Sequence, residues 1–415
     1  MRLASWAAGI GMVLLAAMPA ADAAPPPITI GFDISETGNI AVNGKSVLLA
    51  WQIWQQHVNA NGGLLGRPVR LLYYDDQSNP ALVPGIVTKL LDIDHVDLVL
   101  GEAGTIMIAP AMPIFMQRHL TMLSFFGLDV NKDFHYKNYF SMIPSGGMHP
   151  AAGLADGFFK LAATMNPKPQ TIALSGGDQD FSIHGMDGAR EQAKAMGLTI
   201  VYDHTYPPTT VDYSPIVRAI QATHPDLVFV ASYPADTVGF IRAVGEVGLK
   251  ARMFGGAMVG LQSTAIKQQL GPLMNGIEDY DFWLPVKGFA TPDALEFLKE
   301  YQPKAVEAHI DPLGYYQPPF AYADLQVLQQ AIEGTGSLDQ AKIADYLRSH
   351  TFHTIVGDVK FGPNGEWAEP RTLAVQFRGV TGHDLEQFRA GKTEVVLWPS
   401  QYQTGTLQEP YDSKR

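Results

Sequence analysis

Short apolar runs alternate along this chain with longer segments in which apolar residues recur every three or four positions. The first run, residues 28–32, predicts a buried strand, and Val47, Trp51, Trp54 and Val58 then recur at helical spacing. Further strands are predicted over 69–74, 97–101, 170–174, 198–202, 226–230 and 251–255. Further helices are predicted over 80–91, 187–196, 213–222, 235–247, 321–332 and 338–348, and a closing strand pair over 375–378 and 395–398.

This order of strands and helices is typical of α/β proteins, in which helices cover both faces of a parallel sheet. The pattern runs through two blocks of the chain, so we expect two doubly wound parallel sheets. Ligands bind such sheets beyond the carboxyl ends of the strands. The loops expected to face a ligand are 33–43, 102–105, 125–128, 176–181, 232–236 and 255–260.

Length and composition agree with two folded domains. A chain of 415 residues exceeds what one ordinary hydrophobic core supports. Hydrophobic residues make up 46% and charged residues 17% of the chain, which excludes a disordered protein. The formal net charge of −12 argues against a nucleic-acid partner, because such a partner requires a basic surface.

The N-terminus has the parts of a cleaved export signal. A positive charge at Arg2 precedes an apolar run over 7–17, and residues 21–23 fit the small-residue cleavage pattern. The run is shorter than the ~20 residues that span a bilayer, so an uncleaved anchor is the weaker interpretation. We therefore predict a signal peptide over 1–23 and a mature chain in the periplasm.

The sequence offers no recognisable catalytic or metal-binding arrangement. It has no cysteine, which excludes disulfides, thiolate chemistry and cysteine-ligated metals. Gly176-Gly177-Asp178 lacks the spacing of a nucleotide-binding fingerprint, and no histidine pair has metalloprotease spacing. We expect neither enzymatic activity nor a cofactor.

Three segments carry a resemblance to a known family. Residues 58–69 read VNANGGLLGRPV and are followed over 74–80 by YDDQSNP. Residues 226–250 and 354–365 supply two further segments in the same order. Together they resemble the leucine/isoleucine/valine-binding protein family, over nearly the whole mature chain.

This resemblance implies a type I periplasmic binding protein, an α/β fold of two lobes joined by three chain passages near Ile143, Asp279 and Val356. The first lobe would comprise 27–144 plus 280–355, the second 145–279 plus 356–400, and 401–415 would form a surface tail. A solute would be trapped when the lobes close. The implied partners are an inner-membrane ABC permease and its ATPases, and we expect a monomer.

The resemblance also places the ligand on particular loops. Family members hold the carboxylate of an amino acid at one loop, which in this sequence consists of Glu102, Ala103, Gly104 and Thr105. The backbone amides of this loop and the hydroxyl of Thr105 suit an anionic oxygen. Thr105 could instead be a plain N-cap. Asn43 and Phe181 end two further cleft loops, and Tyr233 matches a tyrosine that lines the family's cleft.

Two positions depart from the family pattern. Phe126, Gly127 and Leu128 stand where the family has a threonine that bonds the amino acid, and Leu128 offers no hydroxyl. Ala257, followed by Met258, stands where the family has an acidic ligand for the ammonium. A buried ammonium without such a partner would cost several kcal/mol, about 2–5.

These departures predict a ligand with a carboxylate and an aromatic or aliphatic body in place of an amino acid. Asp178 or Glu102 could supply a displaced acidic ligand, so an amino-acid receptor remains an alternative. A periplasmic sensor for a signalling partner is a second alternative, because closure of the same fold can be recognised by either kind of partner.

Overall fold

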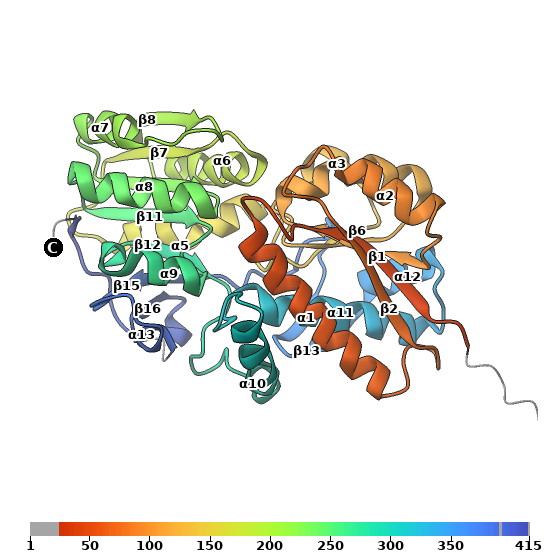
Figure 1. Ribbon diagram of the computed structural model, residues 1–415. Coiled ribbons are helices and arrows are strands. Elements are labelled where there is room, and N and C mark those ends of the chain that lie inside the picture. Colours follow the sequence, from red (N-terminus) through yellow and green to blue (C-terminus); the bar gives the residue numbers. More distant parts are fainter. Residues whose placement is uncertain (1–24, 390–391, 414–415) are drawn as a thin grey trace, which may run out of the picture.

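Two layers of parallel strands, each flanked by helices, lie side by side in the computed structural model, which describes residues 25–389 and 392–413 (Figure 1). The signal peptide predicted over 1–23 lies outside the described residues. Among the described residues, no helix combines the length and the apolar content that a bilayer crossing requires.

The first lobe has six short strands in two adjoining sheets, ordered β2-β1-β3 and β4-β5-β6, and all pairs are parallel. Leu100, between β3 and β4, donates its N–H to the carbonyl of Gly31 at 2.9 Å, so the two sheets continue one another. The strands are β1 (Ile28–Ile34), β2 (Val69–Asp75), β3 (Leu98–Val99), β4 (Gly101–Ala103), β5 (Met122–Phe125) and β6 (Tyr139–Ser141).

The second lobe is built on one seven-stranded sheet, ordered β16-β15-β12-β11-β9-β7-β8. Five strands are parallel, while β15 pairs antiparallel with both β12 and β16. These strands are β7 (Thr171–Gly177), β8 (Thr199–Tyr206), β9 (Leu227–Ser232), β11 (Met253–Met258), β12 (Glu278–Asp281), β15 (Leu373–Phe377) and β16 (Glu394–Trp398).

Helices cover both sheets. In the first lobe α1 and α11 lie together, joined by a bond from Trp54 Nε1 to Gln329 Oε1 at 3.1 Å (Figure 1). Trp51, predicted as a core residue with Trp54, is fully buried against Phe32, with ring centroids 4.6 Å apart. The longer helices are α1 (Ala41–Ala60), α2 (Val83–Asp92), α3 (Thr105–Arg118), α5 (Pro150–Thr164), α6 (Asp180–Ala195), α7 (Ser214–Ala222), α8 (Pro234–Val247), α10 (Pro292–Glu307), α11 (Gln317–Thr335) and α12 (Gln340–Ser349). Shorter elements are α4 (Asn131–Phe134), α9 (Thr264–Leu270), η1 (Gly271–Met274), α13 (Glu386–Arg389) and η2 (Ser400–Tyr402).

The chain passes between the sheets in three segments, 142–149, 282–291 and 361–372. The second lies later than the position predicted near Asp279, because β12 stays in the seven-stranded sheet through Asp281. The third lies later than Val356, because the hairpin of β13 (Thr351–Thr354) and β14 (Gly357–Lys360) packs on α11, where Gln330 Nε2 donates to the His353 carbonyl at 2.9 Å. Both passages are loops, and loops lack the periodic pattern of apolar residues by which the sequence locates helices and strands.

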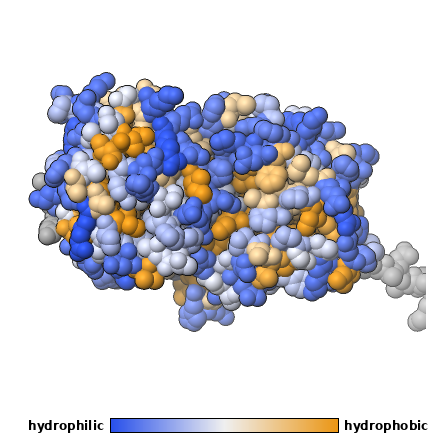
Figure 2. Space-filling view, turned by 90° about the horizontal axis from the view of Figure 1, so that it is seen from above, coloured by the Kyte–Doolittle hydropathy of each residue, from blue (hydrophilic) through white to orange (hydrophobic). Residues whose placement is uncertain are grey.

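The C-terminal segment is more ordered than the predicted surface tail. β17 (Tyr411–Asp412) pairs antiparallel with β10 (Lys250–Ala251), and Tyr411 is 3% exposed. The ring of Tyr411 lies 5.0 Å from that of Phe254. An aromatic side chain in a polar segment thus fastens the chain end to the second lobe. Seen from above, polar residues cover most of the molecular surface and apolar ones form scattered patches (Figure 2).

Candidate ligand-binding cleft

A cavity lies between the lobes, with a volume of about 580 Å³ that includes the space open to solvent. Its walls are loops at the carboxyl ends of strands, as α/β sheets lead one to expect. The first lobe contributes Ser35, Ile40, Asn43, Gly44, Val47, Ala103, Gly104, Thr105, Phe126, Tyr316 and Gln317, the passage contributes Ile143, and the second lobe contributes Phe181, Tyr233, Pro234 and Val259.

Five helices begin at this cavity. Asn43 lies in the first turn of α1, Thr105 begins α3, Phe181 lies in the first turn of α6, Pro234 begins α8 and Gln317 begins α11. Each helix N-terminus carries a partial positive charge of about half an elementary charge. Their convergence makes the cavity favourable for an anion, and none of the described lining side chains is charged.

The first turn of α3 supplies the amide donors predicted at this loop. Helical geometry leaves the N–H groups of Thr105 and Ile106 without a carbonyl four residues earlier in the helix. Gly104 is the N-cap residue, with φ 98°, a conformation that favours glycine. Thr105 therefore begins the helix and is not its cap, contrary to the alternative interpretation.

The Thr105 hydroxyl binds the neighbouring loop. Its Oγ1 accepts from the Leu128 N–H at 3.1 Å and donates to the Phe126 carbonyl at 3.4 Å, and the residue is 2% exposed. The structure gives this hydroxyl a positioning role in place of the predicted ligand contact, because its single O–H donor is directed at the Phe126 carbonyl and is not available to an anionic oxygen. It holds the loop that presents Phe126 to the cavity.

Replacing Thr105 with valine should leave the buried Leu128 N–H without a partner, which costs about 1–3 kcal/mol in the free energy of unfolding. Ligand affinity should fall as well, because Phe126 loses its support. Urea unfolding and calorimetric titration measure the two effects. Thr105→Ser keeps the hydroxyl and should restore both, whereas a Thr105→Val protein with unchanged stability would contradict the positioning role.

Phe126 is the aromatic centre of the wall. Its backbone has φ 58°, which is uncommon for a residue with a side chain. The ring stacks on Phe125 at 4.4 Å and meets Phe282, Tyr316 and Phe320 edge-on at 5.3–5.6 Å. These contacts hold Phe126 in place despite its backbone conformation.

Tyr233 and Phe181 form the facing wall on the second lobe. Their rings lie 5.8 Å apart, and the Phe181 N–H donates to the Tyr233 hydroxyl at 3.4 Å. Opposite them, Tyr316 shares a hydrogen bond with the Tyr280 hydroxyl at 2.8 Å. A flat apolar ligand body would thus lie between aromatic surfaces.

Gln317 is a polar lining residue that the sequence did not single out as a ligand contact. It is 8% exposed, and its Oε1 has no hydrogen-bond partner among the described residues. Buried amides are nearly always bonded, so this one suits a polar group of a ligand.

Seven of the predicted site residues line the cavity: Asn43, Ala103, Gly104, Thr105, Phe126, Phe181 and Tyr233. Four others do not. Leu128, Ala257 and Met258 are fully buried, and Gly127 is packed so closely that an added Cβ would lie 2.6 Å from Ile108. Glu102 lies in β4, and its side chain is outside the described part of the structure. The cavity lining also includes residues that the sequence did not predict: Ser35, Ile40, Gly44, Val47, Ile143, Pro234, Val259, Tyr316 and Gln317.

Buried carboxyl groups lie behind the lining. Ser35 donates to Asp76 Oδ1 at 2.5 Å, and burial together with the Asp76 charge raises the pKa of Asp33 well above its usual value. One turn into α8, burial raises the pKa of Asp236 to about 6, and the carboxyl accepts from the Tyr206 hydroxyl at 2.7 Å. Among the described residues, no three histidines or carboxylates gather in a way that suits a metal ion.

The raised pKa of Asp236 predicts a pH dependence of stability. The folded state keeps this proton up to pH about 6, whereas an unfolded aspartate loses it near its ordinary pKa of 3.8. The free energy of unfolding should therefore fall as pH rises through this window, by up to about 3 kcal/mol. Asp236→Asn should lack this contribution, so its stability relative to wild type should increase between pH about 4 and about 7 in thermal unfolding. A constant difference would contradict it.

The model of the periplasmic binding protein family matches residues 27–379, most of the chain. The chain belongs to this family. Among curated relatives, this periplasmic binding protein is 22% identical to an amino acid binding protein of Pseudomonas aeruginosa, over 82% of this chain and 87% of that one. It is also 22% identical to the Leu/Ile/Val-binding protein of Escherichia coli, over 74% of this chain and 79% of that one.

Solved structures show the same fold. The leucine binding protein LivK of Thermotoga maritima superposes with a TM-score of 0.72 at 19% identity, covering 85% of this chain and 96% of that one. A solute binding protein of an ABC transporter from Rhodopseudomonas palustris, in complex with p-hydroxybenzoic acid, superposes with a TM-score of 0.70 at 18% identity. The match covers 86% of this chain and 94% of that one. The predicted family and its two-lobed α/β fold are confirmed.

Proposed function

We propose that this periplasmic binding protein is the receptor of an ABC-type uptake system and binds a small carboxylic acid with an aromatic or aliphatic body. The observation that carries the proposal is the cleft wall, where five helix N-termini converge and no described lining side chain is charged. The summed dipoles favour a negative group. The first-turn amides of α3 are the donors for its oxygens.

The same wall disfavours an ammonium group. Ala257, at the position expected to be acidic, is buried and lines no part of the cavity. Behind Ser35, burial raises the pKa of Asp33 and so disfavours its charged form, and Asp33 does not line the cavity. The positive helix ends would also repel the ammonium group. An amino acid would therefore bind at a cost of several kcal/mol, about 2–5.

The aromatic lining favours a flat apolar body. Phe126, Tyr316, Phe181 and Tyr233 face the cavity from both lobes. Aromatic rings packed edge-to-face gain about 0.5–1.5 kcal/mol beyond their buried area. Gln317 adds an unpartnered Oε1, which can accept a hydrogen bond from a hydroxyl substituent of the ligand.

The relatives support both parts of the proposal. Two solute binding proteins of ABC transporters from Rhodopseudomonas palustris, similar in fold, are in complex with p-hydroxybenzoic acid and with 3,4-dihydroxybenzoic acid. Other relatives are named for leucine or for amino acids. The partners we propose are an inner-membrane permease and its ATPases, which would bind the closed form of a periplasmic monomer.

A calorimetric screen of the purified mature protein tests the proposal. Benzoate, 4-hydroxybenzoate and a branched aliphatic acid should bind, and leucine and valine should bind at least about a hundredfold more weakly, in line with an unpaired ammonium. Mass spectrometry of ligand released from the freshly purified protein is the complementary measurement. Tight leucine or valine binding without binding of any simple acid would establish an amino-acid receptor instead.

A further inference from the structure

A second cavity lies where the chain makes its third passage between the lobes. Its volume is about 580 Å³, including the space open to solvent. None of its described lining residues also lines the cleft. Its walls include Phe289, Trp367, Arg371, Thr372, Trp398 and Tyr402. Aromatic rings thus surround one arginine.

Arg371 has few partners for its charge. Its guanidinium donates to the Val356 carbonyl and lies 4.6 Å from the centre of the Phe289 ring. Among the described residues, no carboxylate lies within ion-pair distance of it. An arginine carries five N–H donors in a planar fork, and the Val356 carbonyl takes one of them. Burial lowers the pKa of Arg371, so the surroundings disfavour its charged form.

Two further donors of the same cavity wall also lack partners. Trp367 is 3% exposed and Thr372 is 4% exposed. Neither the Trp367 indole Nε1 nor the Thr372 Oγ1 has a hydrogen-bond partner among the described residues. Unpartnered buried polar groups are uncommon, and here two lie with Arg371 on one wall.

We propose that this cavity is a second binding site, for a small organic anion whose carboxylate pairs with Arg371 and whose flat body packs against the surrounding rings. Arginine binds carboxylates through two parallel hydrogen bonds, and the indole and hydroxyl groups can complete the set of donors. Asp358 and Glu369 also line the cavity, but both are exposed and Asp358 already bonds His353 at 2.6 Å. They leave the guanidinium available.

The position of the site links it to lobe closure. Trp367 packs against Phe320 of the first lobe at 6.0 Å, whereas Thr372 leads into β15 and Trp398 ends β16 of the second lobe. A bound anion would contact both lobes and the 361–372 passage. If the anion binds one lobe arrangement more tightly than the other, it changes the affinity of the cleft for the cleft ligand. The cleft ligand then changes the affinity of the second site for the anion by the same factor.

Indole N–H signals in nuclear magnetic resonance test the site directly, with benzoate as the probe. Trp367 and Trp398 line the second cavity, and the described lining of the cleft contains no tryptophan. Benzoate should shift the Trp367 and Trp398 signals, which Trp367→Phe and Trp398→Phe assign in turn, with saturation at millimolar or lower concentration. Arg371→Gln should raise the Kd from these shifts by about tenfold or more, since the charged pair is lost.

Two comparisons keep the result interpretable. Arg371→Lys keeps the charge without the fork and should bind benzoate more weakly than wild type, which covers the case of a Gln variant that fails to fold. Gln317→Leu changes the cleft and leaves the described lining of the second cavity intact, so the Trp367 signal should still titrate with benzoate, and failure of the proposed function is distinguishable from failure of this site. Absent shifts, or an equal Kd in both Arg371 variants and wild type, would overturn the proposal.

Discussion

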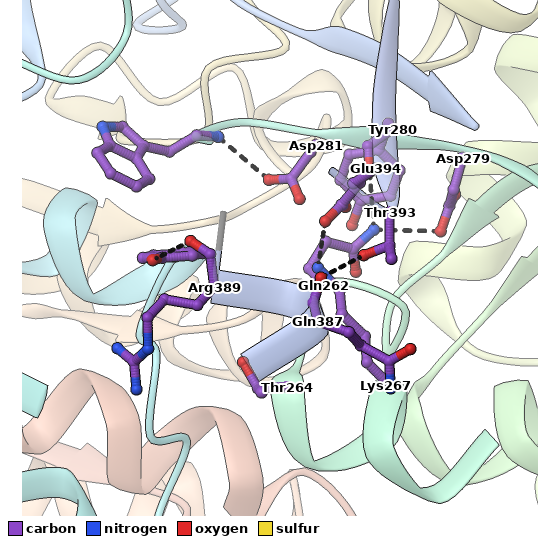
Figure 3. A network of polar contacts seen from close by, with 12 residues as sticks. Gln262, Thr264, Lys267, Asp279, Tyr280, Asp281, Gln387, Arg389, Thr393 and Glu394 are labelled. Carbon is purple, nitrogen blue, oxygen red and sulfur yellow. Dashed lines mark hydrogen bonds and ion pairs between the residues drawn. The ribbon is translucent and has the colours of Figure 1, made fainter. Parts of the chain in front are cut away.

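Replacing Lys267 with methionine is expected to lower the free energy of unfolding by about 3–5 kcal/mol. Lys267 lies on α9, 3% exposed, and its Nζ contacts Glu394 Oε2 at 2.6 Å (Figure 3). Asp281 lies close by, and burial followed by the Glu394 charge raises its pKa well above the usual value. Without the lysine, two buried carboxyl groups would have no cation.

Denaturant unfolding of Lys267→Met near neutral pH measures this loss. The double variant Lys267→Met/Glu394→Gln removes both members of the pair and should recover most of the stability, because the cost comes from an unpaired buried charge and not from the absence of the pair. A single variant that loses less than about 1 kcal/mol would show that the pair is dispensable.

Gly188→Ala should destabilise the second lobe by about 3 kcal/mol, at the upper end of overpacking costs. Gly188 lies on α6 where that helix crosses α5, and an added Cβ would lie 2.1 Å from the Ala151 carbonyl oxygen. The obstructing atoms are backbone, so the helices must separate. Because α6 carries Phe181 into the cleft, ligand affinity should fall together with stability.

Gly85→Ala is the matched control for this change. Gly85 is an exposed residue of α2, and an added Cβ would meet nothing within 4 Å. Alanine should therefore stabilise the helix by about 0.5–1 kcal/mol. Thermal unfolding distinguishes the two alanines, and equal effects of both would contradict the packing argument.

The strand β12 shows where periodic patterns fail. Glu278, Asp279 and Asp281 make three of its four residues acidic, yet all four are buried. Asp279 has its partners in another segment: it accepts from the Met258 N–H at 3.1 Å. It also accepts from Gln262 Nε2 at 3.2 Å (Figure 3). Hydropathy cannot mark such a strand, because its burial depends on partners that only folding brings near.

The cleft was predicted more completely on one lobe than on the other. The loop at Thr105 follows the predicted strand 97–101, Phe126 was placed by the family resemblance, and both line the cavity. Ala257 was also placed by the resemblance, and it lies inside β11 and not beyond its end. Gln317 was missed as a ligand contact, because nothing in a single glutamine before two prolines marks its amide as buried and unpartnered.

The sequence by itself determined the family, the alternation of strands and helices, and the loops that end its parallel strands. Those features follow from local periodicity and short motifs. Only the tertiary structure decided that five helix N-termini meet at one cavity and that the Thr105 hydroxyl is already engaged. It alone also decided that Arg371 lies among aromatic rings with no carboxylate of the described residues in ion-pair distance. Each of these depends on distances between residues far apart in the chain, which periodicity does not encode.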